Sequence, residues 1–78
     1  MNFRDPKILQ AFGRHLRLLR TQKGVTQEEL AYSSGISLSQ IARIETGRIN
    51  PTLCTIVEIA KFLKIHPSEL MSFKLPKH

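Results

Sequence analysis

The part of the chain that decides the fold runs from residue 26 to residue 47 and reads TQEELAYSSGISLSQIARIETG. We interpret it as two short helices joined by a tight turn at Gly35, because glycine adopts left-handed backbone angles at little cost. Thr26 and Glu29 have the spacing of a capping box, which marks the start of the first helix. Ser37 is a suitable cap for the second helix. The segment therefore predicts a helical hairpin, with residues 33–35 as its turn.

The second helix of this pair carries small polar side chains and one arginine, Arg43, on the side predicted to be exposed. Two helices arranged in this way can place the second one in the major groove of DNA. The residues predicted to face inward and hold the pair together are Leu30, Ala31, Ile36, Ile41 and Ile44. Any helical hairpin needs such residues, so they support the fold more than they support DNA binding.

The rest of the chain predicts three further helices and no strands. The first begins at Asp5, which can cap it, and ends at residues 22–24, where Gly24 can take left-handed angles. Another is capped by Thr52, after a loop over residues 48–51. Apolar stripes are formed by Ile8, Leu9, Phe12, Leu16 and Leu19 in the first of these helices, and by Leu53, Ile56, Val57, Ala60 and Leu63 in the second.

A short fifth helix begins at residues 66–69, with Pro67 in its first position and Glu69 placed to reach back toward the helix start. We expect it to carry Leu70, Met71 and Phe73, and we expect the tail over residues 74–78 to be frayed. The 78 residues thus predict an all-α protein, a compact five-helix bundle that forms a single domain over residues 1–78.

The charge balance points to a polyanionic partner. Twelve Lys and Arg residues stand against six Asp and Glu, a net charge of +6, which suits nucleic acid or an anionic membrane surface. No run is long and apolar enough for a membrane span or a signal peptide, so we expect a soluble, cytoplasmic protein of the nucleoid-associated, prokaryotic type. A chain this short buries only about 60% of its unfolded surface, so a second copy is a plausible source of further burial.

Chemistry-bearing residues are few. Cys54 excludes an internal disulfide, and its apolar neighbours predict a small buried hydrophobe rather than a redox-sensing thiol. His15, His66 and His78 share no ligand spacing, so we expect no metal and no other cofactor. We also expect no enzymatic activity, because no nucleophile–base pair or glycine-rich phosphate loop is present.

Several segments together carry a family resemblance: LRLLR at 16–20 with KG at 23–24, TQEELA at 26–31, GIS at 35–37, IARIETG at 41–47 and NPT at 50–52. From about Phe12 to Leu70 the chain resembles the phage-repressor and Cro-like helix-turn-helix proteins, also called the xenobiotic-response-element (XRE) family. The resemblance implies a lambda-repressor-like bundle whose third helix reads the major groove, and it implies a role in transcription regulation. It also implies a partly buried ion pair between Arg20 and Glu45.

The exposed side of the third helix is then the candidate base-reading surface, formed by Ser37, Leu38, Ser39, Gln40 and Arg43. Arg43 is the first choice, because a guanidinium can bond both O6 and N7 of guanine. Leu38 stands where the family often has a polar residue, and it either touches a thymine methyl or packs against Tyr32 or a neighbouring turn. Gln40 reads either a base or a phosphate.

Contacts to the DNA backbone are expected from Thr26, Gln27, Thr46, Arg48 and Asn50. For the last three, a minor-groove contact is the alternative. The resemblance places a phosphate-binding glutamine at Gln27, on a helix N-terminus whose free amides suit an anion. The alternative is an ordinary solvated residue. Family members often carry asparagine or a basic residue where Thr46 stands.

One reading helix covers few base pairs, so we expect a homodimer on an inverted repeat of double-stranded DNA, with reading helices about 34–36 Å apart. The expected dimer surface comprises Ile65, Leu70, Met71 and Phe73; the alternative is that these residues only cover the monomer core. We expect no membrane or small-molecule partner. The other functional hypothesis is a protein-interaction adaptor or antitoxin-type module with the same fold. Repression and activation both remain open, as do a restriction–modification controller and a phage-type regulator.

Overall fold

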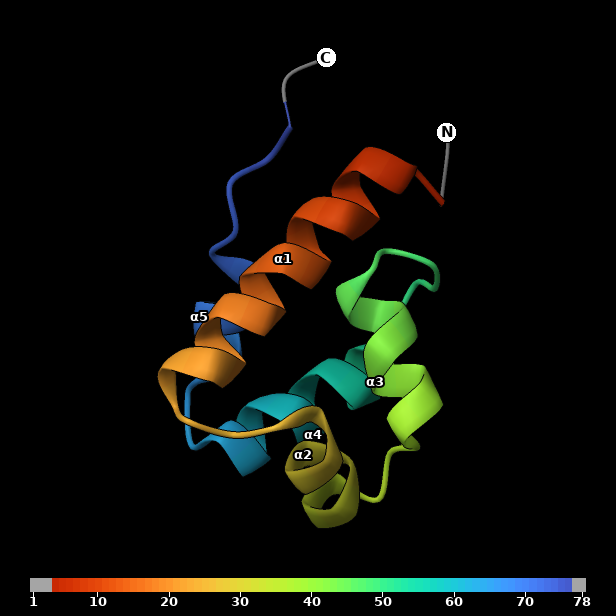
Figure 1. Ribbon diagram of the computed structural model, residues 1–78. Helices are drawn as coiled ribbons and strands as arrows, with labels where there is room; N and C mark the ends of the chain where they lie inside the picture. Colours follow the sequence, from red (N-terminus) through yellow and green to blue (C-terminus); the bar gives the residue numbers. More distant parts are fainter. Residues whose placement is uncertain (1–3, 77–78) are drawn as a thin grey trace.

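The computed structural model describes residues 4–76, and in that range it contains five α-helices and no strands (Figure 1). The helices are α1 (Pro6–Gln22), α2 (Gln27–Ser34), α3 (Leu38–Glu45), α4 (Leu53–Leu63) and α5 (Pro67–Met71). The predicted all-α class and the order of the helices are confirmed. Residues 77–78 of the predicted frayed tail, and with them His78, lie outside the described residues.

The predicted caps of the first four helices are present. The side chains of Asp5, Thr26, Ser37 and Thr52 each accept a hydrogen bond from a backbone N–H in the first turn of their helix. Thr26 also forms both bonds of the capping box with Glu29, each 3.0 Å long. Each cap contributes about 1 kcal/mol to helix stability, so local chemistry accounts for where these helices start.

The hairpin turn differs slightly from the prediction. Gly35 has the expected left-handed angles, with φ of 75°, and its N–H donates to the carbonyl of Ala31 at 3.0 Å. Ser33 and Ser34, predicted as part of the turn, belong to the last turn of α2. The helix extends to the glycine because neither serine has backbone angles that would end it.

The start of α5 is also different. Pro67 is in the first turn as predicted, but the cap is His66, whose Nδ1 accepts from the backbone N–H of Ser68 at 3.0 Å. Among the described residues, no bond from the Glu69 side chain back to the helix start is present. On the other side, the Nε2–H of His15 donates to the Glu69 carbonyl at 2.7 Å, which ties α1 to α5.

The segment after α5 folds back onto α1. The helix ends at Met71, so Phe73, predicted to be helical, follows it in an irregular segment. The Phe73 ring meets the Phe12 ring edge-on, with ring centroids 5.6 Å apart and planes at 83°. This geometry is favourable for aromatic pairs and fixes the end of the chain against the core.

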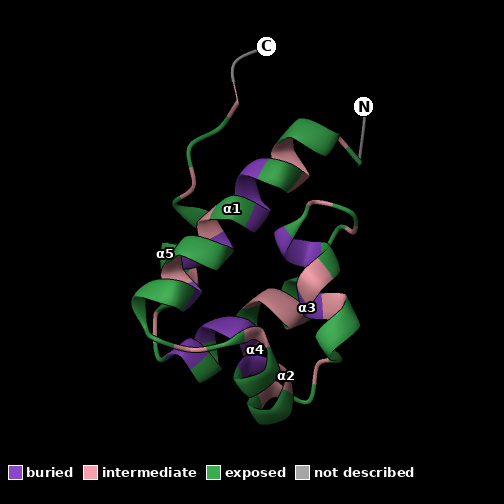
Figure 2. Ribbon diagram, viewed as in Figure 1, coloured by how far each residue is buried: buried purple, intermediate pink, exposed green. Residues whose placement is uncertain are grey.

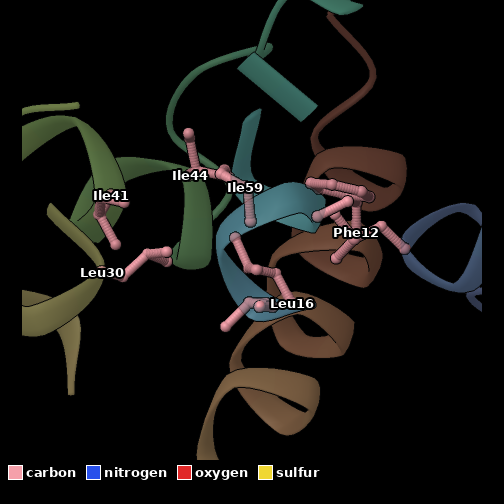
Figure 3. Close-up of a cluster of buried hydrophobic side chains, with 9 residues drawn as sticks. Phe12, Leu16, Leu30, Ile41, Ile44 and Ile59 are labelled. Carbon is pink, nitrogen blue, oxygen red and sulfur yellow. The ribbon is translucent and has the colours of Figure 1, made fainter. Parts of the chain in front are cut away.

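A single hydrophobic cluster receives residues from all five helices (Figure 3). Figure 2 shows the buried parts of α1, α3 and α4 turned toward the middle of the bundle. Burying each large member of the cluster stabilises the fold by about 1.5–3 kcal/mol. The members are Phe12, Leu16, Leu30, Ile41, Ile44, Ile59, Ala60, Leu63 and Leu70.

The apolar stripe predicted for α4 is partly wrong. Leu53 and Val57 are 76% and 40% exposed, whereas Ile59, which the prediction omitted, is fully buried. The segment LCTIVEIAKFL is apolar on more than one side, so periodicity alone did not identify the buried side. The face turned to the core carries Ile56, Ile59, Ala60 and Leu63, a normal helical stripe.

Cys54 is exposed, which contradicts the prediction that it is a buried hydrophobe. It follows Leu53 in the first turn of α4, on the side away from Ile59. The error has the same cause as the stripe, because Cys54 was assigned to the core by its neighbours.

The backbones of α1 and α3 approach closely. A Cβ added at Gly13 would lie 2.5 Å from the carbonyl oxygens of Ile44 and Glu45. A Cβ added at Gly47 would lie 2.6 Å from Cγ of Gln10. Only glycine allows these approaches, so the C-terminal end of α3 is seated directly on α1 (Figure 1).

Candidate nucleic-acid interface

The helix-turn-helix presents one side of α3 to solvent. Ile41 and Ile44 anchor the helix in the core, with exposed fractions of 0% and 1%. Of the five residues predicted to contact bases, Gln40 is half-buried and the others are exposed: Ser37, Leu38, Ser39 and Arg43. The buried isoleucines therefore turn the predicted reading residues outward.

Arg43 stands one turn beyond Ser39 on this exposed side. Both line a shallow hollow together with Ala42, Thr46 and Arg48. The loop after α3 is held close to the helix, since the Arg48 N–H donates to the Arg43 carbonyl at 2.8 Å. Two guanidinium groups are thus gathered on one surface, which favours an anionic ligand.

Leu38 is partly exposed and is not covered by Tyr32. It is 43% exposed, and Tyr32, the residue that was expected to cover it if it faced inward, is itself 92% exposed. Leu38 also lies outside the core cluster. An exposed leucine beside Ser39 and Arg43 gives the surface one apolar position among polar ones.

Gln27 has an unexpected partner. It is the first residue of α2 and half-buried, and its Nε2–H donates to Oε1 of Glu45 at 2.9 Å. It is therefore not the freely solvated residue that was the alternative to a phosphate contact. The amide nitrogen carries a second hydrogen, which no hydrogen bond to the described residues uses.

Thr46 is less suited to a phosphate than expected. Its hydroxyl donates to the carbonyl of Ala42 at 2.9 Å, within α3. Since a hydroxyl has only one hydrogen, Thr46 would have to give up this bond to bind a phosphate oxygen. Arg48, Asn50 and Thr26, the other predicted backbone contacts, are exposed.

The ion pair implied by the family resemblance is present and buried. Arg20 Nε donates to Glu45 Oε2 at 2.5 Å, and Arg20 Nη2 donates to Oε1 at 3.0 Å. The side chains of Arg20 and Glu45 are 9% and 3% exposed. Two parallel bonds between a guanidinium and a carboxylate are the strongest geometry for such a pair.

Arg20 has a further bond, from Nη1 to the carbonyl of Val25 at 2.8 Å. The pKa of Arg20 is held above its ordinary value, chiefly by the hydrogen bond to Glu45; burial opposes this, and the charges of Glu45 and Glu28 add to it. The pair therefore favours the charged form of the guanidinium.

The predicted dimer residues do not form one exposed surface. Leu70 is fully buried in the monomer core, so its assignment to a dimer interface is wrong. Ile65 and Phe73 are half-buried and pack against the same core. Met71 alone of the four is largely exposed, at 53%. The short α5 turns Leu70 inward to close the bundle. The next residue, Met71, therefore faces solvent.

Comparison with known proteins identifies the family to which this fold belongs. Residues 16–70 match the helix-turn-helix (HTH_3) family. The chain belongs to this helix-turn-helix family. The match covers both helices of the predicted hairpin, the loop after α3 and the buried residues up to Leu70. The XRE-type resemblance found in the sequence is confirmed.

Helix-turn-helix relatives cover most of the chain. The uncharacterized HTH-type transcriptional regulator y4dJ of Sinorhizobium fredii is 40% identical over 60 residues, which are 77% of this chain and 78% of that protein. The control protein C.BamHI of Bacillus amyloliquefaciens is 35% identical over 63 residues, 80% of this chain and 78% of that one. The HTH-type transcriptional repressor RghR of Bacillus subtilis is 40% identical over 67 residues, but the chain spans only 49% of its length.

A solved structure shows the same fold. The crystal structure of the restriction-modification controller protein C.AhdI from Aeromonas hydrophila is 45% identical, with a TM-score of 0.78, and the match covers 80% of this chain and 94% of that one. The protein is therefore a transcriptional regulator with a helix-turn-helix DNA-binding fold, a class without enzymatic activity. Among residues 4–76, no helix has the length and apolarity needed to cross a membrane.

Proposed function

We propose that this helix-turn-helix regulator binds double-stranded DNA in a sequence-specific manner, with α3 lying in the major groove. The observation that carries the proposal is the orientation of α3. Ile41 and Ile44 fix one side of the helix in the core. The opposite side presents Ser39 and Arg43, and the guanidinium of Arg48 lies beside them. DNA-binding helices of this class contact base edges mainly with their N-terminal residues, which here include Ser39, and Arg43 lies one turn further on.

Arg43 is the residue proposed to determine most of the sequence preference. Its exposed guanidinium can donate two hydrogen bonds to a guanine, which distinguishes that base pair from the other three. Ser39 can bond several bases and adds less discrimination. Leu38, exposed on the same helix, is suited to the methyl group of thymine.

Contacts to the backbone are proposed from the two ends of the motif. At the start of α2, unpaired amide groups and the second amide hydrogen of Gln27 can donate to one phosphate. After α3, Arg48 and Asn50 lie on the exposed loop that follows the reading helix. These contacts would orient α3 without reading sequence.

We further propose a homodimer on an inverted repeat, with a dimer surface that differs from the one predicted. Leu53 and Val57 lie one turn apart on α4 and are exposed, as is Met71. Met71 also lines an apolar hollow with Ile56 and Pro51. A two-fold axis through this surface would pair two copies through the same residues and cover apolar area that the monomer leaves in water. Binding to DNA would place the dimer in the cytoplasm, with the nucleoid.

A binding-site selection from random duplexes tests this function. We expect enrichment of an inverted repeat whose half-sites are separated by about one helical turn, 34–36 Å. Enrichment of a single half-site would contradict the dimer and leave the reading helix intact. Failure to enrich any duplex, even at low salt, would contradict DNA reading and favour a protein-interaction module with the same fold.

A further inference from the structure

We propose that Glu45 is a positioning residue for the phosphate-binding amide of Gln27, so that the buried Arg20–Glu45 pair belongs to the DNA-binding apparatus as well as to the fold. The inference rests on the proposed function, since it requires the start of α2 to meet the DNA backbone. It assigns to two buried residues a part in holding a contact to DNA.

One oxygen atom joins the two roles. Oε1 of Glu45 accepts from Nη2 of Arg20 at 3.0 Å and from Nε2 of Gln27 at 2.9 Å. The bond to Glu45 uses one hydrogen of the amide and fixes the orientation of the other. Gln27 is the first residue of α2, so this amide is held beside the backbone N–H groups of residues 27 and 28, which the capping box does not use and which can donate to an anion.

Arg20 neutralises the carboxylate that orients the Gln27 amide. A lone carboxylate within hydrogen-bond distance of the amide would repel an incoming phosphate. Arg20 meets Glu45 with two bonds, and its third bond goes to the carbonyl of Val25, just before α2. The same guanidinium therefore fixes the carboxylate and the segment that leads into the proposed phosphate site.

Burial makes the positioning effective. The Arg20 and Glu45 side chains are 9% and 3% exposed, so the acceptor of the Gln27 bond has little freedom to move. A glutamine held in this way before DNA arrives loses less side-chain entropy on binding than a solvated one. Because Glu45 is the last residue of α3, the phosphate contact is also held in a fixed position relative to the reading helix.

A double-mutant cycle tests the positioning role. We expect Gln27→Ala to weaken binding to the selected operator and to random duplex alike, by about tenfold or more. The salt dependence should be unchanged, since the amide is neutral. Arg20→Met combined with Glu45→Leu removes the acceptor and replaces the pair with apolar groups, an exchange that often preserves stability.

The paired replacement should weaken binding about as much as Gln27→Ala does, and adding Gln27→Ala to it should have no further effect. As a matched control, Gln22→Ala removes an exposed glutamine at the end of α1 and should bind as the unaltered protein does. The proposal is overturned if Gln27→Ala costs the same factor with and without the Arg20–Glu45 pair.

A second measurement needs no variant and keeps the test decisive if the paired replacement does not fold. In the free protein labelled with ¹⁵N, the side-chain amide of Gln27 should have an order parameter well above that of Gln22, whose amide is expected in the flexible range, below about 0.6. Equal mobility of the two amides would overturn the proposal.

Different results would contradict the positioning role of Glu45 and the proposed DNA-binding function. If Gln27→Ala binds normally while Arg43→Ala loses operator binding, the positioning role is wrong and the proposed function stands. If the unaltered protein enriches no duplex at all, the proposed function is wrong and the positioning role falls with it.

Discussion

At the scale of single residues, the fold depends on a charged pair in the core. Arg20 and Glu45 form hydrogen bonds with each other. Arg20 also bonds Val25 in the loop before α2, and Glu45 bonds Gln27 at the start of α2. No buried side-chain nitrogen or oxygen lacks a partner in the described residues 4–76. The cost of placing charges inside is thus offset by complete hydrogen bonding.

Glu45→Ala should lower the free energy of unfolding by about 3–5 kcal/mol, because it leaves the Arg20 guanidinium buried without its carboxylate. Denaturant unfolding measures the change. Glu69→Ala, which removes an exposed carboxylate from α5, is the control and should change stability by less than about 0.5 kcal/mol. Equal effects of the two variants would show that the pair is not a stabilising core contact.

Glu29 makes one contribution dependent on pH. The pKa of its carboxyl is held below the ordinary value, mainly because the backbone N–H of Thr26 donates to the carboxylate. The charged form therefore stabilises the fold above the ordinary glutamate pKa, and this stability is lost as pH falls through the lower folded-state value. Glu29→Gln keeps an acceptor for the capping box but cannot titrate.

We expect the melting temperature of Glu29→Gln to fall less than that of the unaltered protein between about pH 5 and about pH 3, the range in which glutamates titrate. Thermal melts followed by circular dichroism across this range provide the measurement. Parallel curves for the two proteins would mean that the Glu29 charge contributes nothing to stability.

At the scale of elements, α3 is set on α1 by glycine. Gly13 lies within α1, and in an open helix a change from glycine to alanine stabilises by about 0.5–1 kcal/mol. Here the new Cβ would lie 2.5 Å from two carbonyl oxygens of α3. Gly13→Ala should therefore destabilise, by about 1–3 kcal/mol or more. Chemical denaturation measures whether the free energy of unfolding falls or rises. A more stable variant would contradict the close approach of α1 and α3.

The individual helices show which features could be predicted from the sequence. Helix starts were predictable because Asp5, Thr26, Ser37 and Thr52 act on their own first turns. The buried side of α4 was not, since apolar residues lie on several of its sides and only packing selects Ile59 over Leu53. Leu70 was misplaced for a related reason, as a short helix gives little periodicity to separate inside from outside.

Parts of the candidate site could be predicted from the sequence and other parts could not. The exposed side of α3 followed from the positions of Ile41 and Ile44, and the Arg20–Glu45 pair followed from the family resemblance. The bond from Gln27 to Glu45 spans eighteen residues and depends on the relative placement of α2 and α3. No spacing in the sequence signals it, and the same is true of the contact of Gly13 with α3.

At the scale of the whole molecule, the proposed dimer makes a prediction about association. Leu53→Glu combined with Met71→Glu places charge on the exposed apolar surface of α4 and the end of α5 without touching the core. Sedimentation should show a dimer for the unaltered protein at micromolar concentration and a monomer for this variant. Tyr32→Glu, on the exposed side of α2, should remain dimeric. If the unaltered protein were a monomer, the proposed homodimer, and with it the inverted-repeat site, would be contradicted.

The central claim is that α3 reads base pairs, and Arg43 tests it most directly. The affinities of the unaltered protein and of Arg43→Ala should be compared on the selected operator and on random duplex at one salt concentration. We predict a loss of about 1–3 kcal/mol on the operator, little change on random duplex, and relaxed preference at one base pair of each half-site. Equal losses on both duplexes, or no loss on the operator, would contradict the account.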